Sequence, residues 1–356
     1  MLQARWGEVT EVLARREGAV EVRVAFASAP ELDGPALLYP TLTGPAAPGD
    51  RVLVNTTAVQ LRLGTGGLHF VMAVERAEAL TPAADGHIVK LRYTPLQHTV
   101  RTVEEGPDAE RLDACPGLAG MPVVTAELHS QVAAIAAGVH AAAPHARVVY
   151  LMPDTAALPL PLSRLVPRLK DAGLIARTIT CGQAFGGDLE AVSLPSALVA
   201  AKVVAGADVV IIAQGPGNAG TGTRLGFSGI AQADWLHSAA ALEGTPIAAA
   251  RISFADPRPR HHGLSHHTLT LLERFTLCPV TLALPQLPPE QADWIGSQIA
   301  PLLPKHRIET YDGEPALSLL SRLGLPVTTM GRTVEQERAF FLAAAAAGVA
   351  AAARLG

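Results

Sequence analysis

Four of the chain's 12 histidines fall within the seven positions from His261 to His267. Ser265 is a preferred N-cap residue, so His266 and His267 would lie in the first turn of a helix, where the helix dipole disfavours imidazolium. A neutral imidazole is what a metal ligand or a general base requires. Asp256 precedes the cluster, and its carboxylate could orient a histidine or bind a metal. We therefore expect Asp256, His266 and His267 to hold a divalent metal ion or to act as catalytic acid–base groups.

The same segment also fits a plainer interpretation. Arg258 and Arg260 stand close to Asp256 in the sequence and could pair with it, which would make the segment a surface or capping cluster. The histidine spacing matches no standard zinc pattern such as HExxH. Both interpretations stay open on the sequence alone.

The second candidate segment is a glycine-rich stretch, Gln214 to Arg224, that follows a strongly apolar run. Glycines allow backbone N–H groups to converge on an anion, and an arginine adds a charged fork. Three glycines match GxGxxG, but no helix opens directly after them, as a dinucleotide fingerprint requires. The residues expected to bind ligand here are Gly215, Gly217, Gly220, Thr221, Gly222, Thr223 and Arg224. The alternative is an irregular connection that needs glycine for positive φ.

Single residues complete the candidate site. His129 begins a predicted helix, Asp154 follows a predicted strand end, and Arg332 lies in a turn where it could contact an anion. Ser130 and Asp188 are most simply helix N-caps. No GxSxG motif is present, so a serine hydrolase has no support. We expect His129 and Asp154 to form the far wall of the catalytic site and Arg332 to bind ligand.

The elements that must position these residues alternate from about residue 120 onward. Apolar runs buried on both faces are typical of parallel strands, and their alternation with helices predicts a layered α/β fold. The predicted strands are 122–126, 147–152, 177–181, 208–213, 246–252, 280–283, 306–310 and 326–329. The predicted helices are 130–141, 162–172, 189–205, 231–242 and 268–275, with further helices after residue 285.

The N-terminal part has a different pattern. Short alternating runs separated by Gly and Pro turns predict a small all-β domain, a barrel or a sandwich, over residues 1–95. Residues 96–120 are of mixed character and are expected to be a linker, so that the α/β domain covers residues 121–356. Ligands of open parallel sheets bind beyond the carboxyl ends of the strands, where the Gly, Asp and His residues gather. The site depends on the strands before residues 214 and 253 being neighbours.

Composition excludes several classes of protein. A formal net charge of -4 and 4% aromatic residues leave little to attract or stack nucleic acid. With 49% hydrophobic and 17% charged residues the chain can bury a core, so we expect a folded protein. The longest apolar run, Phe340 to Ala353, is too short to cross a bilayer and predicts a buried helix. Three scattered cysteines and no signal pattern indicate a cytoplasmic protein without a membrane partner.

Several segments along nearly the whole chain carry a family resemblance. They are GDRVLVNTTAV from Gly49, GTGGLHFV from Gly64, KLRYTPLQ from Lys90, AFGGDLEAV from Ala184, GPGNAGTGTRLGF from Gly215, RISFADPR from Arg251 and SHHTL from Ser265. They resemble the bacterial domain-of-unknown-function family numbered 3866. The resemblance implies a bacterial cytoplasmic protein and supplies no catalytic residues. Asn218 stands where that loop is expected to carry an apolar residue, so its side chain is assigned no role.

Two functional hypotheses follow. The first is an enzyme that acts on a small anionic substrate, phosphate- or carboxylate-bearing, with a divalent metal or the His and Asp residues assisting. The alternative is a non-catalytic regulatory protein that senses a nucleotide or metabolite through the same loop. A third, structural hypothesis is an assembly protein, and the sequence leaves a homo-oligomer such as a dimer open. The cofactor stays unassigned, with a divalent metal as the candidate.

Overall fold

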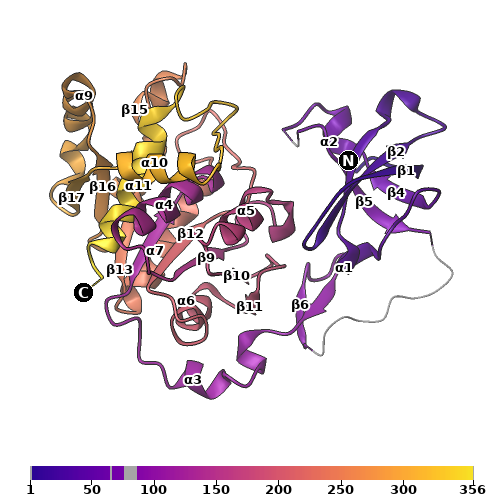
Figure 1. The fold of residues 1–356 in the computed structure, drawn as a ribbon, viewed down its shortest axis with the longest axis horizontal. Coiled ribbons are helices and arrows are strands. Elements are labelled where there is room, and N and C mark those ends of the chain that lie inside the picture. The colour runs from indigo at the N-terminus through magenta and orange to yellow at the C-terminus, as the bar shows by residue number, and fades with distance from the viewer. Residues whose placement is uncertain (1, 65, 76–85, 356) are drawn as a thin grey trace. The chain divides into compact units, whose positions relative to one another are not determined.

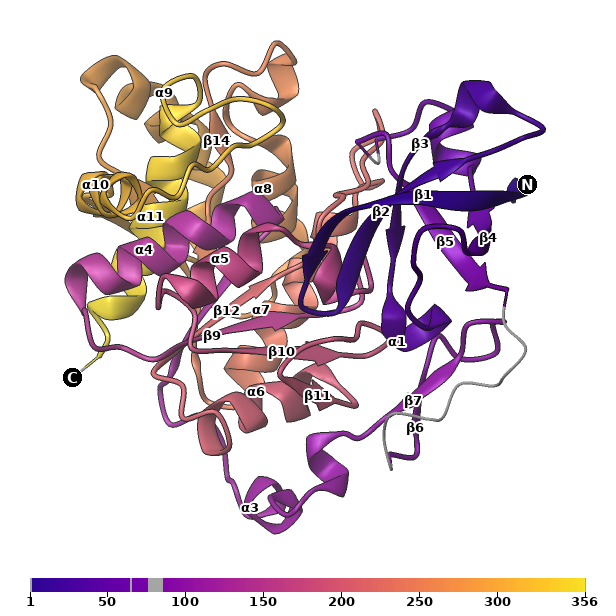
Figure 2. The same ribbon diagram turned by 45° about the vertical axis from the view of Figure 1, so that its right-hand side comes forward.

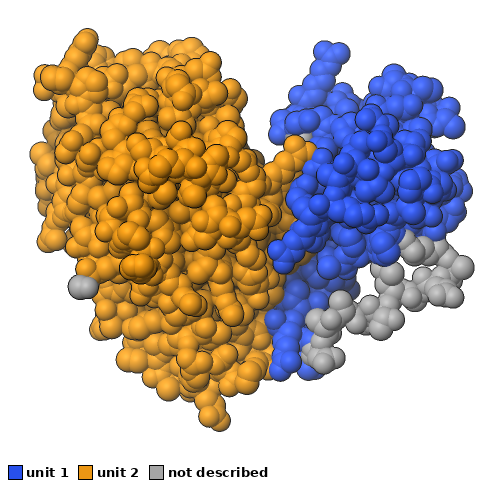
Figure 3. Space-filling view, in the orientation of Figure 1, with its two compact units in different colours: residues 1–101 blue, residues 102–356 orange. Residues whose placement is uncertain are grey.

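The chain folds into two compact units. The structure, a computed structural model, describes residues 2–64, 66–75 and 86–355. The units comprise residues 1–101 and 102–356 (Figure 3). The division falls within residues 96–120, the expected linker, which contain β7 (His98–Val100) and α3 (Ala109–Asp113).

The first unit contains a closed five-stranded barrel, which confirms the predicted all-β domain. Its strands run in the order β1-β2-β3-β5-β4, and closure leaves no open sheet edge. They are β1 (Ala4–Arg16), β2 (Ala19–Ala25), β3 (Gly34–Leu38), β4 (Arg51–Asn55) and β5 (His69–Val74). Among the described pairings of the barrel, β3 and β5 pair in parallel and the others are antiparallel. Inward-facing valines such as Val22, Val24 and Val52 fill the interior.

Smaller elements complete the first unit. Two helices of four residues each follow β3 and β4, and a separate two-stranded sheet precedes the second unit. The helices are α1 (Pro40–Thr43) and α2 (Thr57–Gln60), and the sheet consists of β6 (Ile88–Lys90) and β7.

The second unit is built on an eight-stranded sheet in which every pairing is parallel, as the α/β pattern predicts. Its order is β11-β10-β9-β12-β8-β13-β16-β17. The strands are β8 (Pro122–Ala126), β9 (Val148–Met152), β10 (Arg177–Cys181), β11 (Leu189–Ala191), β12 (Val209–Ala213), β13 (Thr245–Ala249), β16 (Thr281–Pro285) and β17 (Arg307–Tyr311). A separate two-stranded ladder, β14 (Ile252–Ser253) with β15 (Gly263–Leu264), encloses the segment between positions 253 and 263.

Helices cover both faces of this sheet. After β8 the chain moves towards β9, whereas after β12 it moves the other way to β13, and right-handed crossovers then place the connecting helices on opposite faces. One face packs against α4 (Val132–Ala142), α5 (Leu165–Asp171), α10 (Glu314–Arg322) and α11 (Arg338–Ala352). The other packs against α6 (Leu194–Val203) and α7 (Gln232–Ala241). In Figures 1 and 2, α4 and α6 lie on opposite sides of the strands.

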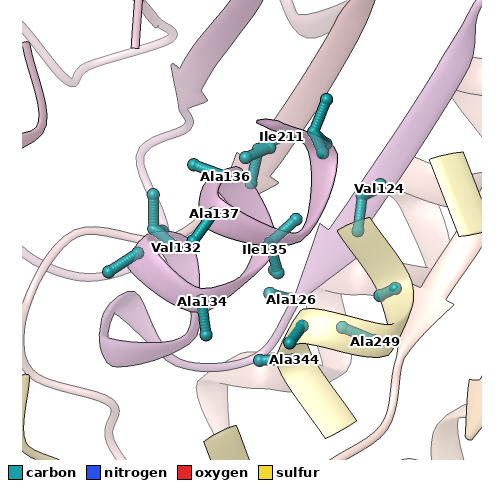
Figure 4. Close-up of a cluster of buried hydrophobic side chains, with 14 of the residues drawn as sticks. Val124, Ala126, Val132, Ala134, Ile135, Ala136, Ala137, Ile211, Ala249 and Ala344 are labelled. Carbon is teal, nitrogen blue, oxygen red and sulfur yellow. The ribbon is translucent and has the colours of Figure 1, made fainter. Parts of the chain in front are cut away.

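A close helix crossing anchors α4 in the core. The glycines Gly138 of α4 and Gly348 of α11 lie at the crossing, where a Cβ on Gly348 would stand 2.0 Å from the carbonyl oxygen of Ile135. Small residues on both helices permit this approach, and buried alanines surround it (Figure 4). The apolar run from Phe340 is thus a buried helix, as expected. Within the described ranges, no helix combines the length and apolar character needed to cross a membrane.

Two element predictions are wrong. The predicted helix 189–205 is instead strand β11 followed by α6, because Ser193 caps a new helix that has a proline in its first turn. The predicted strand 326–329 does not join the sheet. Thr329 pairs with Arg332 across a tight turn in which Met330 has a φ of 49° and Gly331 a φ of 79°.

The remaining helices of the second unit follow β15 and β16. Ser265 caps α8 (His266–Thr270) as predicted, and its hydroxyl accepts the backbone N–H of His267. A π turn, Leu271–Phe275, extends this helix, and α9 (Pro289–Ile299) follows β16. Asp188 is not a helix N-cap, since its carboxylate accepts from Lys170 and from the backbone of Thr178.

Candidate functional site

The candidate site lies beyond the carboxyl ends of the three central strands. β12 and β13, which precede the two candidate segments, are not neighbours, because β8 lies between them. The chain leaves β8 and β12 in opposite directions, which is the switch point where open α/β sheets bind ligands. The residue that follows β8 therefore stands between the two candidate segments. That residue is Glu127.

One carboxylate oxygen of Glu127 joins these loops. Its Oε1 accepts three hydrogen bonds, from Arg251 Nη1 at 2.7 Å, His267 Nδ1 at 2.5 Å and Asn218 Nδ2 at 2.9 Å. Glu127 is 1% exposed and Arg251 is 5% exposed. A buried charge of this kind requires both a partner charge and hydrogen bonds, and Glu127 has both. Gln214 strengthens the junction by donating to the Glu127 carbonyl oxygen at 2.7 Å.

The protonation states at this junction follow from its geometry. Burial disfavours the charged carboxylate, but the hydrogen bond from His267 and the charge of Arg251 outweigh it and hold the pKa of Glu127 below its ordinary value. An ionised Glu127 accepts the Nδ1 proton of His267, so that in the neutral imidazole the lone pair is on Nε2. Phe227 stacks on the same imidazole with ring centroids 3.8 Å apart. The carboxylate and the aromatic ring together fix the orientation of His267, an arrangement known from metal ligands and general bases.

Two further imidazoles pack against His267. Its ring centroid lies 4.9 Å from that of His261 and 4.3 Å from that of His266. One ring nitrogen from each of the three histidines lies within 4.8 Å of the others. Burial and then the charge of Arg251 lower the pKa of His261 to about 3. Burial and then His267 lower the pKa of His266 to about 4, so both rings are neutral at neutral pH.

A cavity of about 660 Å³ opens beside this cluster, with walls from five segments of the second unit, within residues 128–130, 162–168, 216–221, 251–267 and 326–330. Its lining includes His261 and His267 from the cluster, and His129 from the 3-10 turn that precedes α4. Five arginines line it: Arg164, Arg168, Arg251, Arg258 and Arg260. No aspartate or glutamate is among the described residues of its wall. The lining is therefore strongly basic.

The glycine-rich loop contributes only part of its predicted set to this cavity. Gly217, Gly220 and Thr221 line it, whereas Gly215, Gly222, Thr223 and Arg224 are not among its described lining residues. Gly215 serves packing instead, because a Cβ there would lie 2.5 Å from the carbonyl oxygen of Ala157. Arg224 is exposed and lies 3.4 Å from the carboxylate of Glu273.

The predicted acidic residues have other partners. Arg258 grips the Asp256 carboxylate with two bonds, Nε to Oδ1 at 2.8 Å and Nη2 to Oδ2 at 2.6 Å. This pairing with Arg258 lowers the pKa of Asp256 far below its ordinary value. Asp256 thus aims Arg258 at the cavity, and its oxygens are occupied. Asp154 accepts the backbone N–H of Gln183 at 3.0 Å and supports a turn.

Of the two remaining candidates, His129 lines the cavity, whereas Arg332 is not among its described lining residues. Arg332 donates to the buried carboxylate of Glu337 at 2.7 Å and lies 3.8 Å from Asp256. His129 contacts the Tyr150 hydroxyl at 3.1 Å through Nδ1 and the Ser163 hydroxyl at 2.8 Å through Nε2. Burial lowers the pKa of His129 to about 4, so it is a neutral imidazole in the cavity wall.

Sequence reasoning missed Glu127, Arg251 and Asn218. Glu127 is a single charged residue directly after an apolar strand, and that position was the available signal. Arg251 was placed inside the predicted strand 246–252, although its charge marks the end of the apolar run. The side chain of Asn218 binds Glu127, and its Oδ1 accepts from Ser228 at 2.7 Å. No motif marks these residues, because their relation exists only across the sheet.

Comparisons with known proteins give one family. Residues 35–348 match the family model described as protein of unknown function (DUF3866). Neither the curated proteins nor the solved structures include a match to the chain.

Proposed function

The chain belongs to the family of unknown function DUF3866, and we propose that it binds a small anionic metabolite in the arginine-lined cavity. The observation that carries this proposal is a lining with five arginines and, among the residues that the structure describes, no carboxylate. The size of the cavity, about 660 Å³, suits a small molecule. Phosphate- and carboxylate-bearing compounds are the classes that a guanidinium fork recognises best.

The charge balance supports an anion rather than a neutral ligand. Glu127 offsets Arg251, and Asp256 offsets Arg258. Arg168 and Arg260 instead contact a backbone carbonyl and an imidazole, so they add positive charge to the cavity wall. An anion in the cavity would neutralise this excess.

The chemistry that the site supports is proton transfer. Glu127 accepts a hydrogen bond from Nδ1–H of His267. In the neutral imidazole, Nε2 is then the atom that would take a proton from a bound substrate. His267 is also a lining residue of the cavity. We propose that Glu127 positions this base and that the chain is an enzyme acting on the anion.

One observation favours the alternative, a regulatory protein that binds a nucleotide or metabolite without chemistry. His267 is 4% exposed and stacked under Phe227, which limits the access of a substrate to its ring. The two functions share the cavity and differ only in whether the ligand is recovered unaltered. The three cysteines form no disulfide, which supports the proposal that the protein acts in the bacterial cytoplasm.

Ligand binding tests the proposal directly. We expect one member of a panel of sugar phosphates, nucleotides and dicarboxylates to raise the Tm of the full chain. Arg168→Ala combined with Arg260→Ala should weaken its Kd at least about tenfold, since charge-assisted hydrogen bonds contribute roughly 1.5–3 kcal/mol each. Arg274→Ala, an exposed arginine outside the cavity lining, is the matched control.

Two results would contradict this reasoning. If Arg224→Ala weakens ligand binding and the double variant does not, the ligand binds at the exposed glycine loop and not in the cavity. No stabilisation by any anion of the panel would remove the anionic class altogether. If a ligand binds, phosphorus and proton NMR of the mixture after long incubation separates the enzyme from the sensor. If the protein is an enzyme, we expect the wild type to convert the ligand. The His267→Gln variant should bind the ligand with the same Kd but should not convert it.

A further inference from the structure

The three histidines His261, His266 and His267 form a compact group on one wall of the cavity. Their ring centroids lie between 4.3 and 5.1 Å apart, and one nitrogen of each lies within 4.8 Å of the other two. Two are buried and the third is half-buried. The sequence suggested Asp256 as a ligand beside two histidines, but its carboxylate is held by Arg258 and is absent from this group.

We propose that His261, His266 and His267 bind one transition-metal ion. Three protein ligands leave a coordination position open, as in catalytic zinc sites. Three imidazole nitrogens select Zn²⁺, Co²⁺ or Ni²⁺ over Mg²⁺ and Ca²⁺, which prefer oxygen. The inference goes beyond the proposed function, because it concerns a cation and does not depend on the anion. With a metal bound, Nε2 of His267 is a ligand and no longer a base, because its one lone pair cannot bind both a metal ion and a proton.

The hydrogen bonds of the three rings decide which nitrogens are available. Nδ1 of His267 is bound to Glu127 and Nδ1 of His261 lies 2.8 Å from the Ser265 hydroxyl, so each ring presents Nε2. Nε2 of His266 is buried and has no hydrogen-bond partner within the described part of the chain. Nε2 of His261 has only a long contact, 3.4 Å, with Arg260. A buried imidazole nitrogen without a partner is costly, and a metal ion would satisfy it.

The surroundings match those of a bound metal. Glu127 on the far nitrogen of His267 is the carboxylate–histidine pairing that orients metal ligands and raises their basicity. In a tetrahedral zinc site the nitrogens stand about 3.4 Å apart, as follows from bonds of about 2.0–2.1 Å. Metal binding would therefore have to draw the three nitrogens closer than the 4.8 Å within which they now lie.

Positive charge nearby opposes a cation and has to be weighed. Arg251 Nη1 lies 3.2 Å from His267 Nδ1, and Arg258 and Arg260 line the same cavity. Glu127 and Asp256 are paired with Arg251 and Arg258 and offset those two charges. The metal would add charge to a site that already favours an anion, so an anion in the cavity would tighten metal binding.

The test uses Co²⁺ as the probe on the untagged full chain after treatment with a chelator and its removal. We expect one Co²⁺ per chain by calorimetry, with d–d absorption bands of low coordination number, and no binding of Mg²⁺ at the same concentration. His266→Gln should weaken Co²⁺ binding by more than the roughly 10–100-fold that a lost outer partner of a ligand costs. His262→Gln is the matched control, because His262 packs against Phe254 and Trp294 instead of the cluster.

Three outcomes would overturn the proposal: no stoichiometric Co²⁺ in the wild type, equal losses in the His266 and His262 variants, or equal affinity for Mg²⁺. Urea unfolding of both variants, compared with the wild type, shows that any loss of binding is not a loss of fold. Inorganic phosphate titrated in the absence of metal is measured separately. Failure of the metal site and failure of the anion site are thus distinguishable.

Discussion

Replacement of Glu127 by Gln tests whether the junction beneath the site depends on its charge. The amide keeps the size of the side chain and one acceptor oxygen but removes the negative charge. Arg251, 5% exposed, would then be a buried cation without a counter-charge, and His267 would lose its anionic acceptor. Breaking one partner of a buried ion pair costs about 3–5 kcal/mol. That is a large fraction of the roughly 5–15 kcal/mol that stabilises a typical folded protein.

Urea unfolding followed by circular dichroism at pH 7 measures this cost. We expect the free energy of unfolding of the second unit to fall by about 3–5 kcal/mol and its Tm by roughly 10 °C. Arg251→Met leaves the carboxylate unpaired and should cost a similar amount. The double variant removes both charges, so its cost should be well below the sum of the two single costs. The difference between the cost of the double variant and the sum of the two single costs measures the coupling between the two charges, and we expect this coupling to be large.

Acid should weaken the same junction. The pKa of Glu127 is held below its ordinary value in the folded chain, so its contribution to stability is present above the unfolded pKa, near 4.5. It is lost as the pH falls through the lower folded pKa, because the unfolded chain then binds a proton that the folded chain does not. A cost of Glu127→Gln under 1 kcal/mol, or strictly additive single costs, would refute the view that the ion pair holds the loops.

Two further predictions concern other parts of the second unit. His129 is neutral in the fold with a pKa of about 4, against 6.5 unfolded, so its contribution to stability should be lost from about pH 6.5 towards pH 4, by up to about 3 kcal/mol. His129→Gln should flatten that pH dependence in urea unfolding, and an unchanged slope would contradict the assignment. Gly348→Ala should destabilise by about 1–3 kcal/mol because its Cβ would meet Ile135, whereas Gly296→Ala on exposed α9 should stabilise slightly. Equal Tm values for these two variants would show that the crossing of α4 and α11 tolerates a methyl group.

The sequence predicted the layers of the fold better than the contents of the site. Buried parallel strands are apolar on both faces, so 122–126 and 177–181 were predicted with the bounds that the structure gives them. The helix predicted from residue 189 failed because Ser193 with the following proline is a stronger start signal than the apolar periodicity. The order of the strands, and hence the place of β8 between β12 and β13, is a tertiary property that no local pattern records.

The site itself illustrates the same limit. The predicted site consisted mainly of histidines and glycines, because these residues are clustered along the chain. The residue that joins the segments, Glu127, is alone in its segment and lies 140 positions from His267 in sequence. Asp256 is close to the histidines along the chain, but the fork of Arg258 takes up its carboxylate. Proximity in sequence was therefore a poor guide to which polar groups share a site.

One oxygen of Glu127 accepts hydrogen bonds from two loops and from helix α8, and this has a consequence for how such a chain can change over evolutionary time. Loss of the carboxylate alone would leave a buried guanidinium unpaired, and loss of Arg251 alone would leave a buried carboxylate. Either single loss would destabilise the fold, so positions 127 and 251 can be exchanged only together. Asn218 and His267, which donate to Glu127, could then change as well. Among related chains these positions should vary as a set, and their joint identity would mark which relatives share this site.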